Sequence, residues 1–143
     1  MQTAIAQARA AAARGEAPVG AVVVHGGDVI ARAGNRVRAD RDPTAHAELL
    51  ALRAAAGILG TERLETCDLY VTLEPCPMCA GAISLARIRR LYYAASDPKT
   101  GGVEQGPRVF DHPTCHHRPE VIAGLAEAEA AALLRQFFRA RRG

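Results

Sequence analysis

The chain has 143 residues and a net charge of +3, and 49% of its residues are hydrophobic and 23% charged. These values predict one globular domain over residues 1–143, and the small positive charge is compatible with RNA binding without requiring it. They exclude a membrane protein, because no apolar run approaches the ~20 residues of a membrane helix. The N-terminus also lacks the basic cluster and apolar core of a secretory signal, so we expect a cytoplasmic protein.

Hydrophobic periodicity and turn residues divide the chain into alternating helices and strands. Thr44 is a good N-cap, which places His46 and Glu48 in the first turn of a helix, and Gly15 and Gly57 are expected helix stops. The predicted elements are, in chain order, a helix over 2–14, a hairpin of strands 21–24 and 29–33, a helix from Thr44 to 56, a strand over 69–73, a helix from 75 or 77 to about 87, a strand over 91–95, a loop region over 96–118, a strand over 120–123 and a helix over roughly 126–141. This alternation implies an α/β protein, a three-layer α/β/α sandwich around a five-stranded mixed sheet.

Two short motifs supply ligands of the kind that bind zinc. His46 contributes one imidazole, and Cys76 and Cys79 contribute two thiolates from one face of the predicted third helix. The start of that helix favours thiolate over thiol, as a metal ligand requires. Structural zinc is usually closed by four protein ligands, whereas catalytic zinc keeps three and leaves one position open. The sequence therefore predicts one catalytic Zn²⁺ per chain.

Glu48 stands two residues from a predicted ligand and is the expected catalytic residue. In such sites zinc lowers the pKa of water from 15.7 to about 7. The combination His-x-Glu and Pro-Cys-x-x-Cys is typical of the zinc nucleobase deaminases, and so predicts hydrolytic deamination. In that reaction Glu48 would take a proton from the water, deliver it to the ring nitrogen beside the attacked carbon and then protonate the departing ammonia. Such general acid–base catalysis raises the rate roughly 10²–10⁴-fold.

The remaining cysteines and histidines leave alternatives open. A Cys-x-x-Cys pair alone could be redox-active or half of a structural zinc site. Cys115, His116 and His117 could form a second metal site, although adjacent loop residues point in different directions and no carboxylate partner is apparent. Cys67 is expected to be a small buried hydrophobic residue. Cysteines that serve a metal in this way fit a reducing cytosol and no disulfide framework.

The chain resembles the bacterial tRNA-specific adenosine deaminases, of the cytidine deaminase-like superfamily, over nearly its whole length. The resemblance rests on Pro18-Val19-Gly20-Ala21-Val22, Gly34-Asn35-Arg36, Asp42-Pro43-Thr44-Ala45-His46-Ala47-Glu48, Tyr70-Val71-Thr72-Leu73-Glu74-Pro75-Cys76, Met78-Cys79-Ala80-Gly81-Ala82-Ile83, Asp97-Pro98-Lys99-Thr100-Gly101 and Phe137-Phe138-Arg139-Ala140-Arg141-Arg142. It implies that the enzyme converts the wobble adenosine of a tRNA anticodon loop to inosine and works as a homodimer with RNA lying across both subunits.

The same resemblance implies the substrate-binding residues. These are Asn35 for the target nucleoside, the Ala47 backbone for the new oxygen of the base, Asp97, Lys99 and Thr100 for the flanking anticodon nucleotides, and Phe138, Arg139 and Arg141 for the tail that closes on the RNA. Residues 103–118 depart from the family pattern, and the N-terminus is shorter than usual. Contacts from those two regions are therefore not carried over.

Two other functions compete with this one. The first is deamination of a free base or nucleoside such as guanine, cytosine or cytidine on the same fold, but a small substrate would not need the arginine-rich tail. The second is a non-catalytic, zinc-stabilised RNA-binding subunit, but such a protein would not need Glu48 beside an open zinc site.

Overall fold

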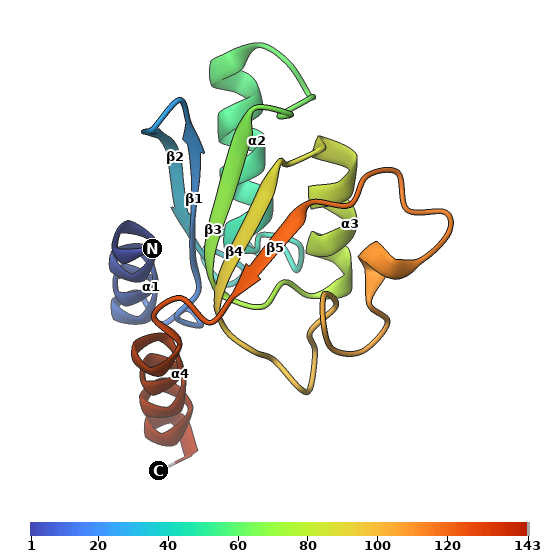
Figure 1. Ribbon diagram of the computed structural model, residues 1–143. Helices are drawn as coiled ribbons and strands as arrows, with labels where there is room; N and C mark the ends of the chain where they lie inside the picture. Colours follow the sequence, from blue (N-terminus) through green and yellow to red (C-terminus); the bar gives the residue numbers. More distant parts are fainter. Residues whose placement is uncertain (143) are drawn as a thin grey trace.

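The computed structural model describes the backbone of residues 1–142 and the side chains of residues 1–141. Within residues 1–142, no helix is long and apolar enough to cross a membrane. The elements, in chain order, are α1 (Gln2–Ala13), β1 (Gly20–His25), β2 (Asp28–Gly34), α2 (Ala47–Leu59), β3 (Cys67–Leu73), α3 (Pro77–Ala86), β4 (Arg90–Ala95), the short 3-10 helix η1 (Val109–Asp111), β5 (Glu120–Ala123) and α4 (Glu127–Arg142) (Figure 1).

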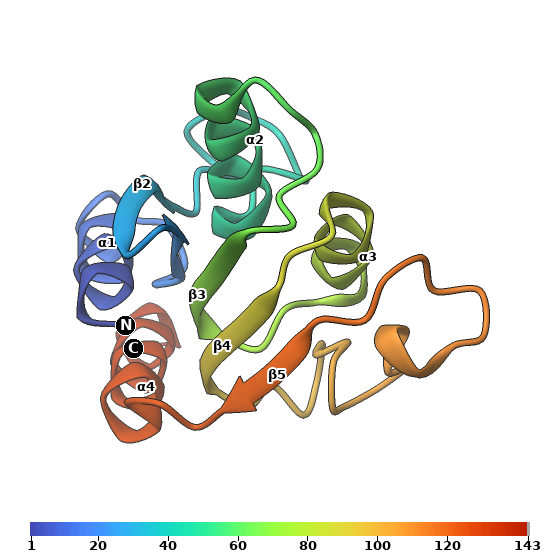
Figure 2. The same cartoon turned by 45° about the horizontal axis from the view of Figure 1, so that its top comes forward.

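The five strands form one mixed sheet in the order β2-β1-β3-β4-β5. β1 runs antiparallel to both β2 and β3, whereas β3, β4 and β5 run parallel to one another. Helices α1 and α4 lie on one face of the sheet and α2 and α3 on the other (Figures 1 and 2). The predicted three-layer α/β/α sandwich with a five-stranded mixed sheet is therefore confirmed.

The carboxyl ends of β3 and β4 meet at one edge of the sheet. The register pairs Leu73 at the end of β3 with Ala95 at the end of β4. The segments that leave these two strands therefore begin side by side, and one of them leads directly into α3. Ligand sites in open α/β sheets gather at this edge, outside the carboxyl ends of the strands.

A stripe of alanines seats α2 closely on the sheet. Ala47, Ala51 and Ala55 recur every four residues, which is one face of a helix, and all three are fully buried in the main core. Short side chains let the helix backbone approach the strands, so packing along its whole length fixes the position of its N-terminus. That N-terminus carries the first motif.

The boundaries of α2 differ from those expected. Thr44 is not the N-cap, because both its N–H and its hydroxyl donate to the carboxylate of Asp42, and His46, with extended backbone, takes the capping position instead. Gly57 does not stop the helix, since it lies within the last turns on an exposed surface. The helix ends one turn later at Gly60, whose φ of 68° is the left-handed conformation that favours glycine.

Candidate active site

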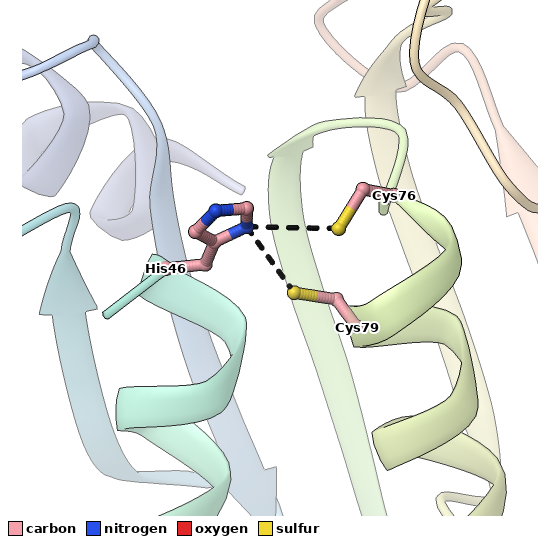
Figure 3. A group of neighbouring side chains, drawn as sticks. All are labelled: His46, Cys76 and Cys79. Carbon is pink, nitrogen blue, oxygen red and sulfur yellow. Dashed lines mark hydrogen bonds between the residues drawn. The ribbon is translucent and has the colours of Figure 1, made fainter. Parts of the chain in front are cut away.

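His46, Cys76 and Cys79 converge between the N-termini of two helices. His46 caps α2, Cys76 caps α3, and Cys79 lies in the first turn of α3, so the imidazole and the two sulfurs face one another (Figure 3). The Nδ1 atom of His46 lies 3.6 Å from Sγ of Cys76 and 3.5 Å from Sγ of Cys79. All three candidate ligand atoms lie within 4.8 Å of one another.

These distances fit a tetrahedral zinc ion. Zn–N bonds of about 2.0–2.1 Å and Zn–S bonds of about 2.3 Å at tetrahedral angles place nitrogen and sulfur roughly 3.5 Å apart. The two separations from the His46 imidazole match that value. One imidazole and two thiolates are also a donor set that zinc prefers. Both the spacing and the chemistry of the three residues therefore suit zinc.

The hypothesis of a second metal site finds no support. Within residues 1–141, the His46 group is the only cluster of three or more His, Cys, Asp or Glu side chains with ligand spacing. Cys115 instead contacts the Ser84 hydroxyl through its sulfur, at 3.2 Å, and His117 bonds the carbonyl of Ile88 at 2.8 Å. Cys67 is fully buried in the core, as predicted.

Contacts among His46, Cys76 and Cys79 shift their pKa values in a way that favours the binding of a metal cation. A hydrogen bond from Cys79, together with contact with His46, lowers the pKa of Cys76 to about 4. The hydrogen bond between Cys79 and Cys76, together with burial, raises the pKa of Cys79. Hydrogen bonding to Cys76 raises the pKa of the His46 imidazole. Negative charge thus accumulates on the sulfur of Cys76 at the N-terminus of α3, and a coordinated metal ion would deprotonate both thiols.

Glu48 is a buried carboxyl group beside this cluster. It lies in the first turn of α2 and is only 4% exposed, yet it lines the same cavity as His46 and Cys76. Burial raises the pKa of Glu48 to about 7, and the negative charge of Cys76 contributes in the same direction. A carboxyl group in such surroundings can both accept and release a proton near neutral pH.

The cluster opens into a cavity of about 680 Å³, within the range of small-ligand sites. Most of the sequence-predicted site residues line it. The lining residues are Ala17, Val19, Asn35, His46, Glu48, Leu73, Glu74, Cys76, Asp97, Lys99, Thr100, Leu134, Phe138 and Arg141.

Asn35 and Ala47 are bonded to each other at the floor of the site. The Ala47 N–H donates to Oδ1 of Asn35 over 2.8 Å, and the Asn35 N–H donates to the carbonyl of Val19. The oxygen of Asn35 is occupied by this bond, and its side chain also lines the cavity, where its amide NH₂ group can donate to a ligand. A base oxygen that reaches the Ala47 N–H would share this donor with Asn35.

The carboxylate of Asp97 is used within its own loop. It accepts the N–H groups of Lys99 and Thr100 at 3.1 and 3.0 Å and the hydroxyl of Thr100 at 2.5 Å. Asp97 therefore shapes the turn that presents Lys99 and Thr100, both exposed at the rim of the cavity. Its direct contact with flanking nucleotides stays a prediction.

The C-terminal helix completes the rim, with the two aromatic residues of the tail packed edge to face. Phe138 is 47% exposed and lines the cavity. Arg141 also lines it, with its guanidinium 4.1 Å from the ring centre of Phe137 and a hydrogen bond to the carbonyl of Gly15. Arg139 is exposed and lies outside the lining residues. The side chain of Arg142 lies outside the described residues.

Sequence reasoning missed part of the cavity wall. Ala17, Val19, Leu73 and Leu134 give it an apolar surface, and no ligand chemistry marks such residues in a sequence. Glu74 was also missed, although a carboxylate directly after an apolar strand is a recognisable signal. It is only 2% exposed, so something in the fold must compensate its burial.

Comparison of the sequence with known proteins finds similarity to deaminases. The family model of the MafB19-like deaminases matches residues 1–142. The chain is 61% identical over 142 residues to a tRNA-specific adenosine deaminase of Agrobacterium fabrum, an alignment that covers 99% of this chain and 93% of the relative.

Solved structures agree with this grouping. One from a study of A-to-I editing by tRNA:A34 deaminases at the wobble position of transfer RNA superposes with a TM-score of 0.92 at 60% identity, covering 94% of this chain and 97% of the other. The guanine deaminase of Nitrosomonas europaea superposes with a TM-score of 0.76 at 31% identity, covering 95% and 81% of the two chains.

Proposed function

The chain belongs to the MafB19-like deaminase family, and on that premise we propose that it is a zinc-dependent tRNA adenosine deaminase that hydrolyses the wobble adenosine of an anticodon loop to inosine. The observation that carries the proposal is the convergence of His46, Cys76 and Cys79 beside buried Glu48, in a cavity whose rim carries cationic and aromatic side chains. The tRNA-specific relative is far more similar in sequence than the guanine deaminase.

Each residue of the site has a part in the reaction. His46, Cys76 and Cys79 would hold zinc, which when bound supplies Lewis-acid activation of the attacking water. Glu48 takes one proton from that water and passes it to the ring nitrogen next to the attacked carbon. It then moves the second proton, from the new hydroxyl group, to the amino group, which leaves as ammonia when the C–N bond breaks. Asn35 is the donor that orients the nucleoside, and the Ala47 N–H lies beside it.

The rest of the cavity selects and shields the substrate. Val19, Leu73 and Leu134 offer apolar surface on which an extruded base excludes water. Lys99 and Arg141 supply positive charge to the neighbouring phosphates, and Phe138 offers a ring for stacking. An anticodon loop suits such a site because its bases are already unpaired and can enter a pocket without opening a duplex.

One incubation tests the proposal against the free-base alternative. Zinc-loaded protein is incubated with total tRNA, which is then sequenced for adenosine read as guanosine, and in parallel with guanine, cytosine and cytidine. We expect wobble-position editing and negligible ammonia release from the small substrates. Rapid turnover of guanine with unedited tRNA would instead support the activity of the structurally similar guanine deaminase.

We also propose that the enzyme is a cytoplasmic homodimer. Support comes from family resemblance and from large apolar side chains left exposed on α3, where Leu85 is 64% and Met78 38% exposed. The four free cysteines fit a reducing compartment, where tRNA is also found. Sedimentation at micromolar concentration should give twice the mass of the 15.1 kDa chain, and a purely monomeric species would contradict the dimer.

A further inference from the structure

Glu74 is a buried carboxylate that the reaction does not use. It directly follows β3 and stands two residues before Cys76. Its side chain is 2% exposed, and its partners are backbone N–H groups from a segment much later in the chain. Oε1 accepts the N–H of Asp97 at 3.0 Å, and Oε2 accepts those of Val103, Glu104 and Gln105 at 3.2, 2.9 and 3.0 Å.

This arrangement requires a carboxylate. Four converging N–H groups form a concave nest that binds a negative group, because each donor directs a partial positive charge toward the same point. An ionised carboxylate is acceptor-only and offers enough lone pairs for all four donors. A glutamine at this position would keep one oxygen but would turn an NH₂ group toward N–H donors, so part of the nest would lose its acceptor.

The loop also closes tightly around Glu74. A Cβ atom on Gly101 would lie 2.7 Å from the carboxyl carbon of Glu74 and 2.5 Å from the carbonyl oxygen of Asp97. The N–H of Gly102 donates to the carbonyl of Pro75 over 2.8 Å, so the segment after β4 is bonded to the turn that enters α3 (Figure 1). Glu74 thus fills the centre of the loop, and the loop has no room for a side chain at Gly101.

One side chain therefore links two parts of the cavity wall. The zinc-binding turn follows Glu74 in sequence, and the 97–105 segment carries Lys99 and Thr100 at the rim. We infer that Glu74 is a positioning residue: by holding the 97–105 segment against the zinc-binding turn, it sets how the RNA strand beside the target base lies relative to the catalytic centre. The inference rests on the proposed function, since it takes the substrate to be tRNA.

A purely structural role is separated from this one by a matched control. Asp68 lies on β3, the strand that leads to Glu74, is also buried at 7% exposure, and forms a two-bond ion pair with Arg89 at 2.9 and 2.9 Å. It lies at the opposite end of β3 and does not line the cavity. Asp68→Asn therefore removes a buried carboxylate from β3 without touching the 97–105 segment.

Two measurements on zinc-loaded wild type, Glu74→Gln and Asp68→Asn test the inference. Hydrogen exchange should speed up at the amides of Val103, Glu104 and Gln105 in Glu74→Gln alone. Steady-state kinetics on an anticodon stem-loop should show kcat/KM reduced roughly 10–100-fold in Glu74→Gln, chiefly through KM, with unchanged zinc content. Asp68→Asn should keep wild-type kinetics.

The outcomes separate the inference from the function on which it rests. Unchanged exchange in Glu74→Gln, or faster exchange with wild-type kinetics, would overturn the positioning role while tRNA editing stands. A wild-type protein that does not edit tRNA would overturn both. If Glu74→Gln does not fold, Gly101→Ala perturbs the same contact from the loop side, and it should reproduce the KM defect; wild-type KM in this variant would also overturn the inference.

Discussion

The two walls of the cavity are built in different ways. The inner wall, formed by His46, Glu48 and Cys76 with Cys79 buried beside them, lies at the N-termini of α2 and α3, and the packing of both helices on the sheet fixes it. The outer wall consists of Asp97, Lys99, Thr100, Phe138 and Arg141. It stands on a loop held by hydrogen bonds and on the last turns of α4. We propose that the inner wall holds the chemistry on rigid elements and that the outer wall recognises the RNA. Damage to the first should affect every substrate, and damage to the second only RNA.

The largest effect is expected at the metal ligands. Cys76→Ala should lose almost all zinc and all measurable deamination, because two remaining ligands leave the metal held too weakly. Metal analysis of the purified protein together with the tRNA editing assay measures both. Cys67→Ala is the matched control, since Cys67 is a buried cysteine outside the cluster and should keep its zinc. Full zinc retention by Cys76→Ala would contradict the three-ligand site.

Glu48→Ala should lower deamination by roughly 10²–10⁴-fold while zinc and folding are retained, because the change removes the proton carrier but no metal ligand. Single-turnover rates at saturating enzyme and metal analysis of the same preparation provide the test. Wild-type turnover would remove Glu48 from the mechanism. Zinc loss would show instead that Glu48 is a ligand.

The inner wall was predictable from the sequence because its chemistry is local. His46 and Glu48 are two residues apart, Cys76 and Cys79 three, and each pair lies at the start of one helix, so residue type and spacing identify both. The five strands were found for a similar reason, since runs of apolar, β-branched or aromatic residues between turns need no distant information. Both ends of α2 were predicted wrongly, because the side chain of Thr44 bonds to Asp42 and because the helix continues past Gly57 to Gly60.

The contacts that build the outer wall could not be predicted from the sequence and became visible only in the folded structure. The N–H partners of Glu74 lie between 23 and 31 residues later, in a segment without periodicity, so no sequence pattern connects them. Family resemblance supplied Lys99, Thr100 and Arg141, but the structure alone shows that the Asp97 carboxylate shapes its own turn. It also shows that Arg139 and Arg141, though close in sequence, differ in their access to the cavity.

Arg141 offers a test confined to the outer wall. Arg141→Ala should weaken tRNA binding roughly tenfold, as expected for one charged hydrogen bond of about 1.5 kcal/mol. Deleting residues 139–143 should weaken it further and reduce the salt dependence of affinity by a slope of about 0.7 per lost phosphate contact. Zinc content and folding should be unchanged in both variants.

Binding titrations of tRNA at several salt concentrations measure these effects. Arg135→Ala is the control, because Arg135 is an exposed arginine on the same helix that does not line the cavity. Equal effects of Arg135→Ala and Arg141→Ala would mean that the tail acts only through net charge. An unchanged salt slope after the deletion would exclude the tail from RNA contact.

The smallest effect on activity is expected at Glu16. This residue lines neither wall but holds the loop that precedes His46. Glu16 is 3% exposed and accepts the N–H groups of Arg38 and Ala39 at 3.1 and 2.8 Å, which fixes the loop between Asn35 and His46. Glu16→Gln should reduce the free energy of unfolding by about 1–3 kcal/mol at pH 7, because an amide cannot accept both donors. Activity at low temperature should stay close to wild type, since packing of α2 holds His46.

The pH dependence of this loss identifies the charge as its cause. Burial opposes ionisation of Glu16, but the N–H groups of Ala39 and Arg38 and the nearby arginines outweigh it and lower the pKa of this carboxyl below its ordinary 4.5. A carboxyl whose pKa is lowered on folding stabilises the protein above its unfolded value and loses that effect as the pH falls through the folded value. The difference in unfolding free energy between wild type and Glu16→Gln should therefore be full at pH 7 and shrink below about pH 4.5.

Denaturant titrations of both proteins in the presence of a chelator measure this difference in unfolding free energy without a contribution from metal loss. Glu62→Gln, at an exposed position, is the control. A difference that is the same at pH 7 and at acid pH would show that the shape of the side chain, and not its charge, holds the loop.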